Sequence, residues 1–304
     1  MMAVGSPIET VRLSKTYDKT VDALVDLNLK VDPGEVFGYL GPNGAGKSTT
    51  IRLLLGLIRP TSGTATLFGI DTWRRTVEAH GRVGYLPGDL RLSDKLTARE
   101  QLESLSRLRG RVDGRVRGEL CERLGVVLDR PIRQLSKGNR QKLGIVQAFM
   151  HRPDLVVLDE PTTGLDPLLQ SEVRTLIRET ADDGRSVFLS SHSLDEVQHV
   201  ADRVGVIRSG RLADVDSVER LRERSRRHVT ITFAAPADVT SFAAIDGVRV
   251  GSEDGAVLRL TAPESAMDAL VRTAAAHRIV DFVSQPADLE EIFLELYRES
   301  DDGG

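Results

Sequence analysis

The sequence contains a single cysteine, Cys121, and no apolar run long enough to cross a membrane. One cysteine excludes an internal disulfide and is typical of a protein kept in a reducing compartment. The longest apolar run, residues 53–58, includes Gly56 and is far shorter than the roughly 20 residues of a membrane-spanning helix. Residues 1–7 lack the basic start and apolar core of a secretory signal. We therefore expect a cytoplasmic protein, unless a partner holds it at a membrane.

The chain also lacks an excess of positive charge, repeats of short period and low-complexity segments. Its net charge is −4, which argues against a nucleic-acid partner held by a broad basic face. Apolar residues make up 40% and charged residues 28% of the sequence, as in ordinary soluble globular proteins. With 304 residues, the chain is long enough for two domains that each bury a core.

One glycine-rich segment carries the most specific chemical signal. It fits the phosphate-binding pattern G-x-x-x-x-G-K-[ST] at every fixed position and consists of Gly41, Pro42, Asn43, Gly44, Ala45, Gly46, Lys47, Ser48 and Thr49. Glycines let successive backbone N–H groups turn inward around a polyphosphate, and the next helix directs its positive end to the same place. Lys47 would supply a positive charge to the β- and γ-phosphates, and the Ser48 hydroxyl would be a ligand for Mg²⁺. We therefore expect this segment to bind a nucleoside triphosphate.

The neighbouring segments have the pattern that such a loop requires. Residues 35–40 indicate a strand before it, and residues 49–57 an apolar helix after it. A glycine-rich loop before an ordinary helix is the alternative, which this context disfavours. Further strand-like segments, at residues 82–86, 155–158, 186–190 and 203–207, alternate with helical ones. The alternation predicts an α/β domain with parallel strands.

Two capping-box patterns predict helix starts. Thr97 with Glu100 precedes a helical pattern, and the chain stays helical, without a strand signal, over residues 90–150. We therefore expect a helical insertion there. Ser193 with Glu196 has the same capping pattern and predicts another helix.

A second chemical signal lies at the end of a strand. Residues 155–160 are a run of apolar residues that ends in Asp159 and Glu160. Asp159 would hold Mg²⁺, directly or through water, and Glu160 would polarise the attacking water. Two acids at a strand end are by themselves more often a solvated terminus. The phosphate-binding loop upstream favours the catalytic interpretation.

An arginine-rich segment, residues 220–227, separates the α/β pattern from the rest of the chain. We interpret it as a solvated linker between domains at residues 1–219 and 228–304, with contact to anionic lipid head groups as the alternative. Beyond it the expected elements follow the order βαββαβ of a ferredoxin-like domain. They lie at residues 228–233, 237–244, 248–250, 257–260, 263–277 and 279–283, and an amphipathic helix is expected at residues 289–297.

Taken together, residues 8–215 resemble the nucleotide-binding subunit of an ATP-binding-cassette (ABC) transporter. Residues 135–139, Leu-Ser-Lys-Gly-Asn, resemble the signature LSGGQ of that family, with departures at Lys137 and Asn139. Residues 164–167, Gly-Leu-Asp-Pro, resemble its D-loop, and His192 its switch histidine. Tyr17 lies where the family places an aromatic residue against adenine.

The resemblance implies a composite site, in which two subunits enclose two ATP molecules with Mg²⁺. Ser136 and Gly138, before a helix expected at residues 140–150, would grip the γ-phosphate of the other subunit's ATP, and Asp166 would cross the same interface. His192 would contact the γ-phosphate, although a capped surface histidine is the alternative. Tyr17 would stack on adenine, or would be an ordinary strand-end aromatic. Because stacking does not read the base edge, GTP could replace ATP in part.

One position departs from the family at a place that matters. Where the family has a glutamine that touches Mg²⁺ or water and senses the membrane partner, this chain has Gly88, followed by Asp89. Either Asp89 reaches the metal one residue later, or the contact is lost. Lys137 adds a positive charge near a phosphate site, or faces solvent.

Residues 288–296 resemble the tail of the drug- and antibiotic-export branch, of the daunorubicin-resistance type, with a generic ferredoxin-like accessory domain as the alternative. The resemblance implies an ATPase subunit, as homodimer or heterodimer, that drives a separate integral membrane permease from the inner face of the membrane. A ribosome-associated cassette protein would have two cassettes, and a DNA-repair cassette a long coiled coil. A third alternative is a nucleotide-gated module with little turnover that regulates a protein partner.

Overall fold

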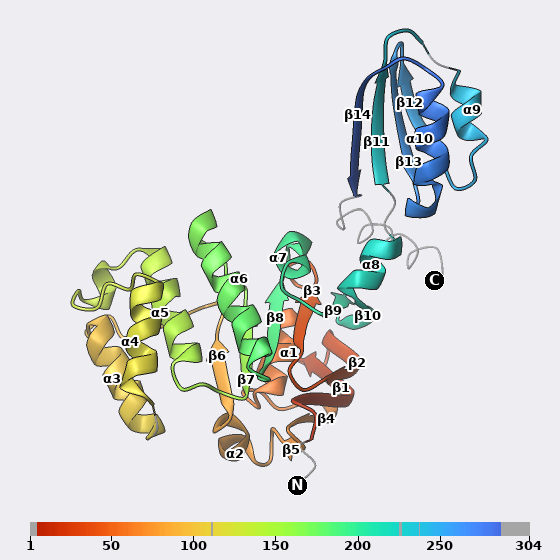
Figure 1. Cartoon of the computed structure of the whole chain (residues 1–304). Helices are drawn as coiled ribbons and strands as arrows, with labels where there is room; N and C mark the ends of the chain where they lie inside the picture. Colours follow the sequence, from red (N-terminus) through yellow and green to blue (C-terminus); the bar gives the residue numbers. More distant parts are fainter. Residues whose placement is uncertain (1–4, 111, 225–226, 237, 287–304) are drawn as a thin grey trace. The chain divides into compact units, whose positions relative to one another are not determined.

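The computed structural model describes residues 5–110, 112–224, 227–236 and 238–286, which form two compact units, Met1–Val215 and Asp216–Gly304 (Figure 1). The expected boundary lay at residue 219, and residues 220–227 were expected to be a linker. Instead, the helix α8, Val218–Arg224, occupies most of that segment. Val218 and Leu221 lie three residues apart and are both buried, a helical spacing that the surrounding arginines obscure in the sequence.

An antiparallel sheet opens the first unit, with the strand order β2-β1-β4-β5. Its strands are β1 (Ile8–Tyr17), β2 (Val21–Val31), β4 (Ser62–Leu67) and β5 (Ile70–Asp71). In the pair of β1 with β2, Ile8 lies opposite Val31, and Tyr17 lies opposite Val21 at the turn. This register places Tyr17 at the end of the sheet where the two strands are joined.

A six-stranded sheet, with the order β10-β9-β3-β8-β7-β6, forms the centre of the first unit. Its strands are β3 (Val36–Leu40), β6 (Val83–Leu86), β7 (Leu155–Asp159), β8 (Ser186–Ser191), β9 (Arg203–Arg208) and β10 (Arg211–Ser217). The pairings of β9, β3, β8, β7 and β6 are parallel, as the sequence predicts. Every residue of β3, β7 and β8 is buried, which is typical of parallel strands that are covered on both faces.

The parallel register brings three strand ends to one edge of this sheet. Leu40 is paired with Ser191, and Asp159 with Ser190, so the loops that follow β3, β7 and β8 begin side by side. Open parallel sheets bind their ligands at this carboxyl edge. Inside the sheet, the rings of Phe37 and Phe188 stack with their centroids 5.9 Å apart.

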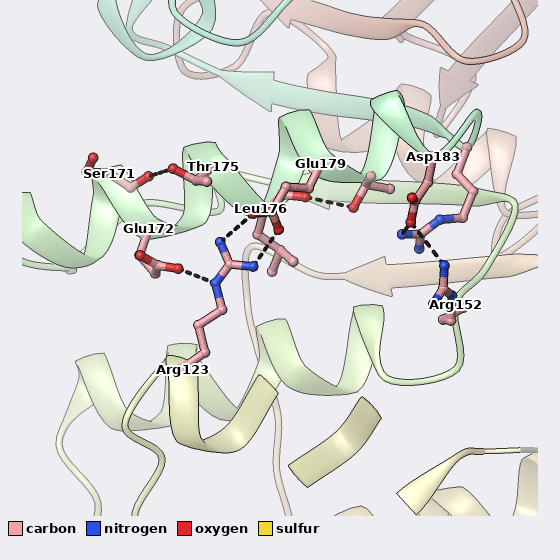
Figure 2. A network of polar contacts seen from close by, with 10 residues as sticks. Arg123, Arg152, Ser171, Glu172, Thr175, Leu176, Glu179 and Asp183 are labelled. Atoms are coloured by element: carbon pink, nitrogen blue, oxygen red, sulfur yellow. Dashed lines mark hydrogen bonds and ion pairs between the residues drawn. The ribbon is translucent and has the colours of Figure 1, made fainter. Parts of the chain in front are cut away.

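The helices of the first unit are α1 (Lys47–Leu54), α2 (Thr76–His80), α3 (Ala98–Arg109), α4 (Gly114–Arg123), α5 (Lys137–Phe149), α6 (Pro167–Asp182) and α7 (Leu194–Gln198), with the 3-10 turn η1 (Ile132–Gln134). Between β6 and β7 the described residues form helices and no strand, and α3, α4 and α5 gather there (Figure 1). The guanidinium of Arg123 on α4 bonds Glu172 and Glu179 on α6, which joins this helical segment to the rest of the unit (Figure 2).

The capping predictions have different outcomes. Thr97 caps α3 and forms the expected reciprocal bonds with Glu100, so that capping box is confirmed. Ser193 does precede α7, but its side chain makes no capping bond, and the predicted box with Glu196 is wrong. The Glu196 carboxylate is engaged elsewhere, by the hydroxyls of Thr162 and Ser191.

The second unit contains α8, β11 (Arg227–Phe233), α9 (Val239–Ala243), β12 (Arg249–Asp254), β13 (Val257–Ala262), η2 (Glu264–Ala266), α10 (Met267–Ala275) and β14 (Ile279–Pro286). Its four strands form an antiparallel sheet in the order β12-β13-β11-β14. Alternate residues of β11, including Val229 and Ile231, enter a separate core with Phe242 and Leu270. The helix expected at residues 289–297 lies outside the described residues.

Candidate active site

The glycine-rich loop between β3 and α1 has a backbone that only glycine accommodates at key points. Gly44 and Gly46 have φ angles of 83° and 111°, in the region that L side chains rarely adopt. A Cβ on Gly46 would lie 2.6 Å from Ala23 O, and one on Gly41 would lie 2.5 Å from Ile207 O. The loop is therefore closely packed against the backbone, and α1 begins directly after Gly46.

Lys47 is the first residue of α1 and is almost completely buried. Its ammonium group donates to Gly41 O at 2.5 Å and to Pro42 O at 3.3 Å. It also lies 3.5 Å from Glu160 Oε1. The positive charge is thus held over the loop, where the sequence predicts phosphate groups.

Ser48 and Asp159 meet across the edge of the sheet. The Ser48 hydroxyl donates to Asp159 Oδ2 at 3.0 Å, and the Ser190 hydroxyl donates to Asp159 Oδ1 at 2.5 Å. Hydroxyl and carboxylate oxygens are ligands that Mg²⁺ accepts, together with waters and the phosphates of a substrate. The described residues contain no cluster of three His, Cys, Asp or Glu side chains that could hold a metal by themselves. This donor set therefore fits Mg²⁺ that is held jointly with a nucleotide.

Glu160 follows β7 and lies beside His192, which follows β8. Glu160 Oε2 is 2.7 Å from His192 Nδ1, and Glu160 N donates to Ser190 O at 3.1 Å. Glu160 has a φ of 53°, a conformation that is uncommon for a residue other than glycine. Gln141 on α5 donates to Pro161 O at 2.9 Å and supports the next residue of this loop. The arrangement holds a carboxylate and an imidazole together at the carboxyl edge.

These residues line one cleft of about 790 Å³, a size that suits a nucleotide. Its lining includes Pro42, Asn43, Gly44, Gly46, Lys47, Ser48, Thr49, Asp159, Glu160 and His192. Tyr85 and Arg52 also line it, and sequence reasoning missed both. Burial, and then the negative charge of Asp159, raises the pKa of Tyr85 to about 12, so its phenol stays neutral at physiological pH.

Six residues predicted for nucleotide binding lie outside this lining: Gly41 and Ala45 of the glycine-rich loop, and Tyr17, Ser136, Gly138 and Asp166 from other segments. Tyr17 ends β1, with the Lys15 ammonium 5.1 Å from the centroid of its ring. Ser136 caps α5 by accepting a bond from Asn139 N at 3.3 Å. Tyr17 and Ser136 each contact a residue close to them in sequence, and they lie in different segments of the first unit.

Gly138 and Asp166 belong to a second group of site candidates, together with Ser136. A Cβ on Gly138 would lie 3.3 Å from Gly164 O, so the signature-like turn is next to the D-loop-like segment. Asp166 caps α6 by accepting from Leu169 N at 3.0 Å. The helix α5 begins at Lys137, earlier than the predicted residue 140, because Ser136 supplies the cap.

Gly88 and Asp89 both line the cleft but differ in their contacts. A Cβ on Gly88 would lie 3.2 Å from Asp159 Oδ2. The carboxylate of Asp89 is instead paired with Arg91 Nη2 at 3.0 Å, and its side chain is 76% exposed. The position of Gly88 is therefore next to the carboxylate of Asp159, and the Asp89 carboxylate has a guanidinium partner.

Comparisons with known proteins agree with this geometry. Residues 24–163 match the ABC transporter family. The chain is similar to the bacitracin transport ATP-binding protein BcrA of Bacillus licheniformis, at 38% identity over 73% of each protein. It is also similar to the daunorubicin/doxorubicin resistance ATP-binding protein DrrA of Streptomyces peucetius, at 35% identity over 95% of this chain and 92% of that protein.

Solved structures show the same fold. One is an ATP-binding subunit of an ABC transporter, with a TM-score of 0.66 and 29% identity over 72% of this chain and 93% of that one. Another is the dimeric cassette MJ0796 in a post-hydrolysis state with ADP and Pi, with a TM-score of 0.63 and 25% identity over 69% of this chain and 98% of that one. These similarities confirm the resemblance that the sequence motifs indicate. The chain belongs to the ABC transporter ATP-binding proteins, in their drug- and antibiotic-export branch, and is an ATPase subunit.

Proposed function

We propose that this chain hydrolyses ATP as a dimer, around two ATP molecules, and thereby drives export through a separate integral membrane permease. The observation that carries the proposal is the meeting of two pairs in one cleft. Glu160 lies 2.7 Å from His192, and Ser48 lies 3.0 Å from Asp159, beside the ammonium of Lys47. A carboxylate base, a polar partner for phosphate and a metal-binding pair are the parts that phosphoryl transfer to water needs.

Each residue then has a distinct task. The loop amides of residues 41–49 and Lys47 bind the β- and γ-phosphates. Ser48 and Asp159 would hold Mg²⁺, which would supply positive charge to the phosphate oxygens when bound. Glu160 orients the attacking water and accepts its proton as the bond to the γ-phosphorus forms and the bond to the β-phosphate oxygen breaks. His192 contacts the γ-phosphate.

Two further assignments concern the adenine base and the metal. Tyr17 stacks on adenine; it pairs with Val21, and Val21 is two residues before Ala23, which lines the cleft. Asp89 lines the cleft, but its carboxylate is paired with Arg91, so we expect this predicted metal ligand to contribute little to Mg²⁺ binding.

The dimer explains why part of the predicted site lies outside the cleft of its own chain. Ser136, Gly138 and Asp166 are close together through Gly164 and do not line that cleft. In a dimer they would face the γ-phosphate bound by the other subunit, as the resemblance implies. The partner subunit is a second copy of this chain or a relative of it.

The names of similar proteins support the permease and the location. Similar proteins are named for bacitracin transport and for daunorubicin and doxorubicin resistance. Among the described residues, no helix is long and apolar enough to span a bilayer. The transport and resistance functions in those names support a chain that its permease holds at the cytoplasmic face of the membrane. In this assembly the described helices between residues 90 and 150 are the helical insertion of the cassette, and the second unit is a ferredoxin-like accessory domain.

The substitution Glu160→Gln tests this proposal. The variant should bind ATP but lose phosphate release, because its amide cannot accept the proton of water. It should also accumulate as a dimer in gel filtration with ATP and Mg²⁺, since hydrolysis no longer opens it. Phosphate release at the rate of the unsubstituted protein, or a variant that binds ATP and stays monomeric, would count against the proposal.

A further inference from the structure

A half-buried carboxylate, that of Glu196, joins the two loops that carry Glu160 and His192. Glu196 lies on α7 and accepts hydrogen bonds from two hydroxyls. Ser191 Oγ donates to Glu196 Oε2 at 2.6 Å, and Thr162 Oγ1 donates to Glu196 Oε1. Thr162 follows β7, whereas Ser191 is the last residue of β8. One side chain therefore joins segments that are separated by about thirty residues of sequence.

Both hydrogen-bond partners of Glu196 are buried. Ser191 is fully buried and Thr162 is 4% exposed. The Ser191 hydroxyl also accepts a bond from Ser193 N at 2.9 Å, which orients its own proton toward Glu196. Hydrogen bonds to an ionised carboxylate are shorter and stronger than those between neutral groups. The two hydrogen bonds to Glu196 therefore constrain the distance between the two loops.

The tied residues are next to the proposed catalytic groups in the chain. Thr162 is two residues beyond Glu160, and Ser191 directly precedes His192. Glu160 and His192 touch each other across the same two loops, at 2.7 Å. A shift of either loop would therefore change the distance between Glu160 and His192.

We propose that Glu196 is a positioning residue for ATP hydrolysis. It holds Glu160 and His192 at their working separation through Thr162 and Ser191, without touching the nucleotide. The inference rests on the catalytic roles proposed above for Glu160 and His192. It also explains why Glu196 does not cap α7, since its carboxylate is fully engaged by the two hydroxyls.

The substitution Glu196→Ala removes both hydrogen bonds to the carboxylate and leaves every residue that lines the cleft unsubstituted. We expect ATP affinity within about twofold of the unsubstituted protein, and kcat lower by about ten- to a hundredfold, as small misplacements of catalytic groups cause. Glu196→Gln should restore most of kcat, because its amide oxygen can accept from Ser191 while its NH₂ donates to Thr162 Oγ1. The measurements are equilibrium binding of ATP and steady-state phosphate release.

Two further variants separate positioning from general stability. Thr162→Val keeps the shape of the side chain but loses the hydroxyl, so it should lower kcat when it is the only substitution. Added to Glu196→Ala, it should have little further effect on kcat. Asp195→Asn is the matched control, since it neutralises an exposed carboxylate on the same helix and should leave kcat unchanged. Additive effects of Thr162→Val and Glu196→Ala would overturn the proposal.

The outcome also distinguishes this inference from the function on which it rests. If Glu196→Ala turns over ATP at the normal rate while Glu160→Gln does not, the positioning role is wrong and the catalytic site stands. If Glu160→Gln itself hydrolyses ATP normally, the proposed roles in the cleft are wrong. If Glu196→Ala fails to fold, Glu196→Gln and Thr162→Val provide the test. We expect Glu196→Gln to keep more of kcat than Thr162→Val, and equal losses in the two variants would overturn the proposal.

Discussion

Gly88 lies against Asp159, so closely that a Cβ on Gly88 would come within 3.2 Å of Asp159 Oδ2. The structure thus puts the residue that departs from the family pattern next to the proposed metal ligand. A side chain there could reach the metal site after a shift of a few tenths of an ångström by the Asp159 carboxylate. We therefore expect the residue type at position 88 to affect how Mg²⁺ binds.

We expect Gly88→Gln to lower the Mg²⁺ concentration needed for half-maximal ATP hydrolysis by a few fold, because its amide oxygen adds a hard ligand beside Asp159. Gly88→Ala is the control, since it adds the Cβ without an oxygen and should not lower that concentration. Asp89→Asn should change it little, because Arg91 already pairs with the Asp89 carboxylate. If Asp89→Asn instead raised this Mg²⁺ concentration strongly, Asp89 would be the metal ligand that one of the two sequence-based alternatives predicts.

The link between α4 and α6 should contribute modestly to stability. Arg123 bonds Glu172 and also reaches Glu179 Oε1 from Nη2 at 3.2 Å (Figure 2). We expect Arg123→Met to lower the free energy of unfolding by about 1 kcal/mol in urea, since both carboxylates are partly solvent-screened. High salt should reduce the difference between the two proteins.

Arg115→Met is the matched control for Arg123. Arg115 lies on the same helix, but its side chain is 79% exposed, and its ion pairs with Asp113 and Glu119 are 4.0 and 3.9 Å long. Its removal should leave the urea midpoint unchanged. Equal effects of the two substitutions would show that the contacts with α6 do not stabilise the unit.

Stability should also depend on pH through His151. Burial, and then the positive charge of Arg109, lowers the pKa of His151 to about 4. The unfolded chain, with an ordinary histidine pKa near 6.5, therefore binds a proton before the folded chain does as pH falls. The free energy of unfolding therefore decreases as pH falls from about 6.5 to about 4. The decrease is on the order of 1–2 kcal/mol after allowance for partial solvation.

The substitution His151→Gln isolates this effect. Its amide can still donate to Val83 O, the partner of His151 Nε2 at 3.1 Å, but it does not titrate. The difference in unfolding free energy between the two proteins should therefore change with pH only in that window. A constant difference from pH 7 to pH 4 would show that His151 titrates normally in the folded chain.

The sequence predicts the parts of this site that depend on local patterns. The glycine-rich loop, the strand that ends at Asp159 and the cap at Thr97 each occupy one short segment, where residue type determines backbone conformation. The order of the strands supports the rest, because parallel strand ends meet at one edge.

Contacts across long sequence separations were not predictable in the same way. Glu196 has the pattern of a helix cap, yet its partner Thr162 lies 34 residues away. Arg123 bonds Glu172 and Glu179, which lie 49 and 56 positions further along the chain. Val218 and Leu221 are buried within a segment whose arginines predict exposure. In each case, packing in three dimensions selects a partner that no local pattern specifies.

The described residues of each unit form a hydrophobic core of their own, and this separation has a thermodynamic consequence. One encloses residues such as Phe37 and Phe188, the other residues such as Phe233 and Phe242, and all the residues that line the cleft belong to the first unit. A ligand raises the melting temperature only of the cooperative block to which it binds. Heating the chain with ATP should therefore separate two heat-absorption peaks in a calorimeter, and only the peak of the first unit should move.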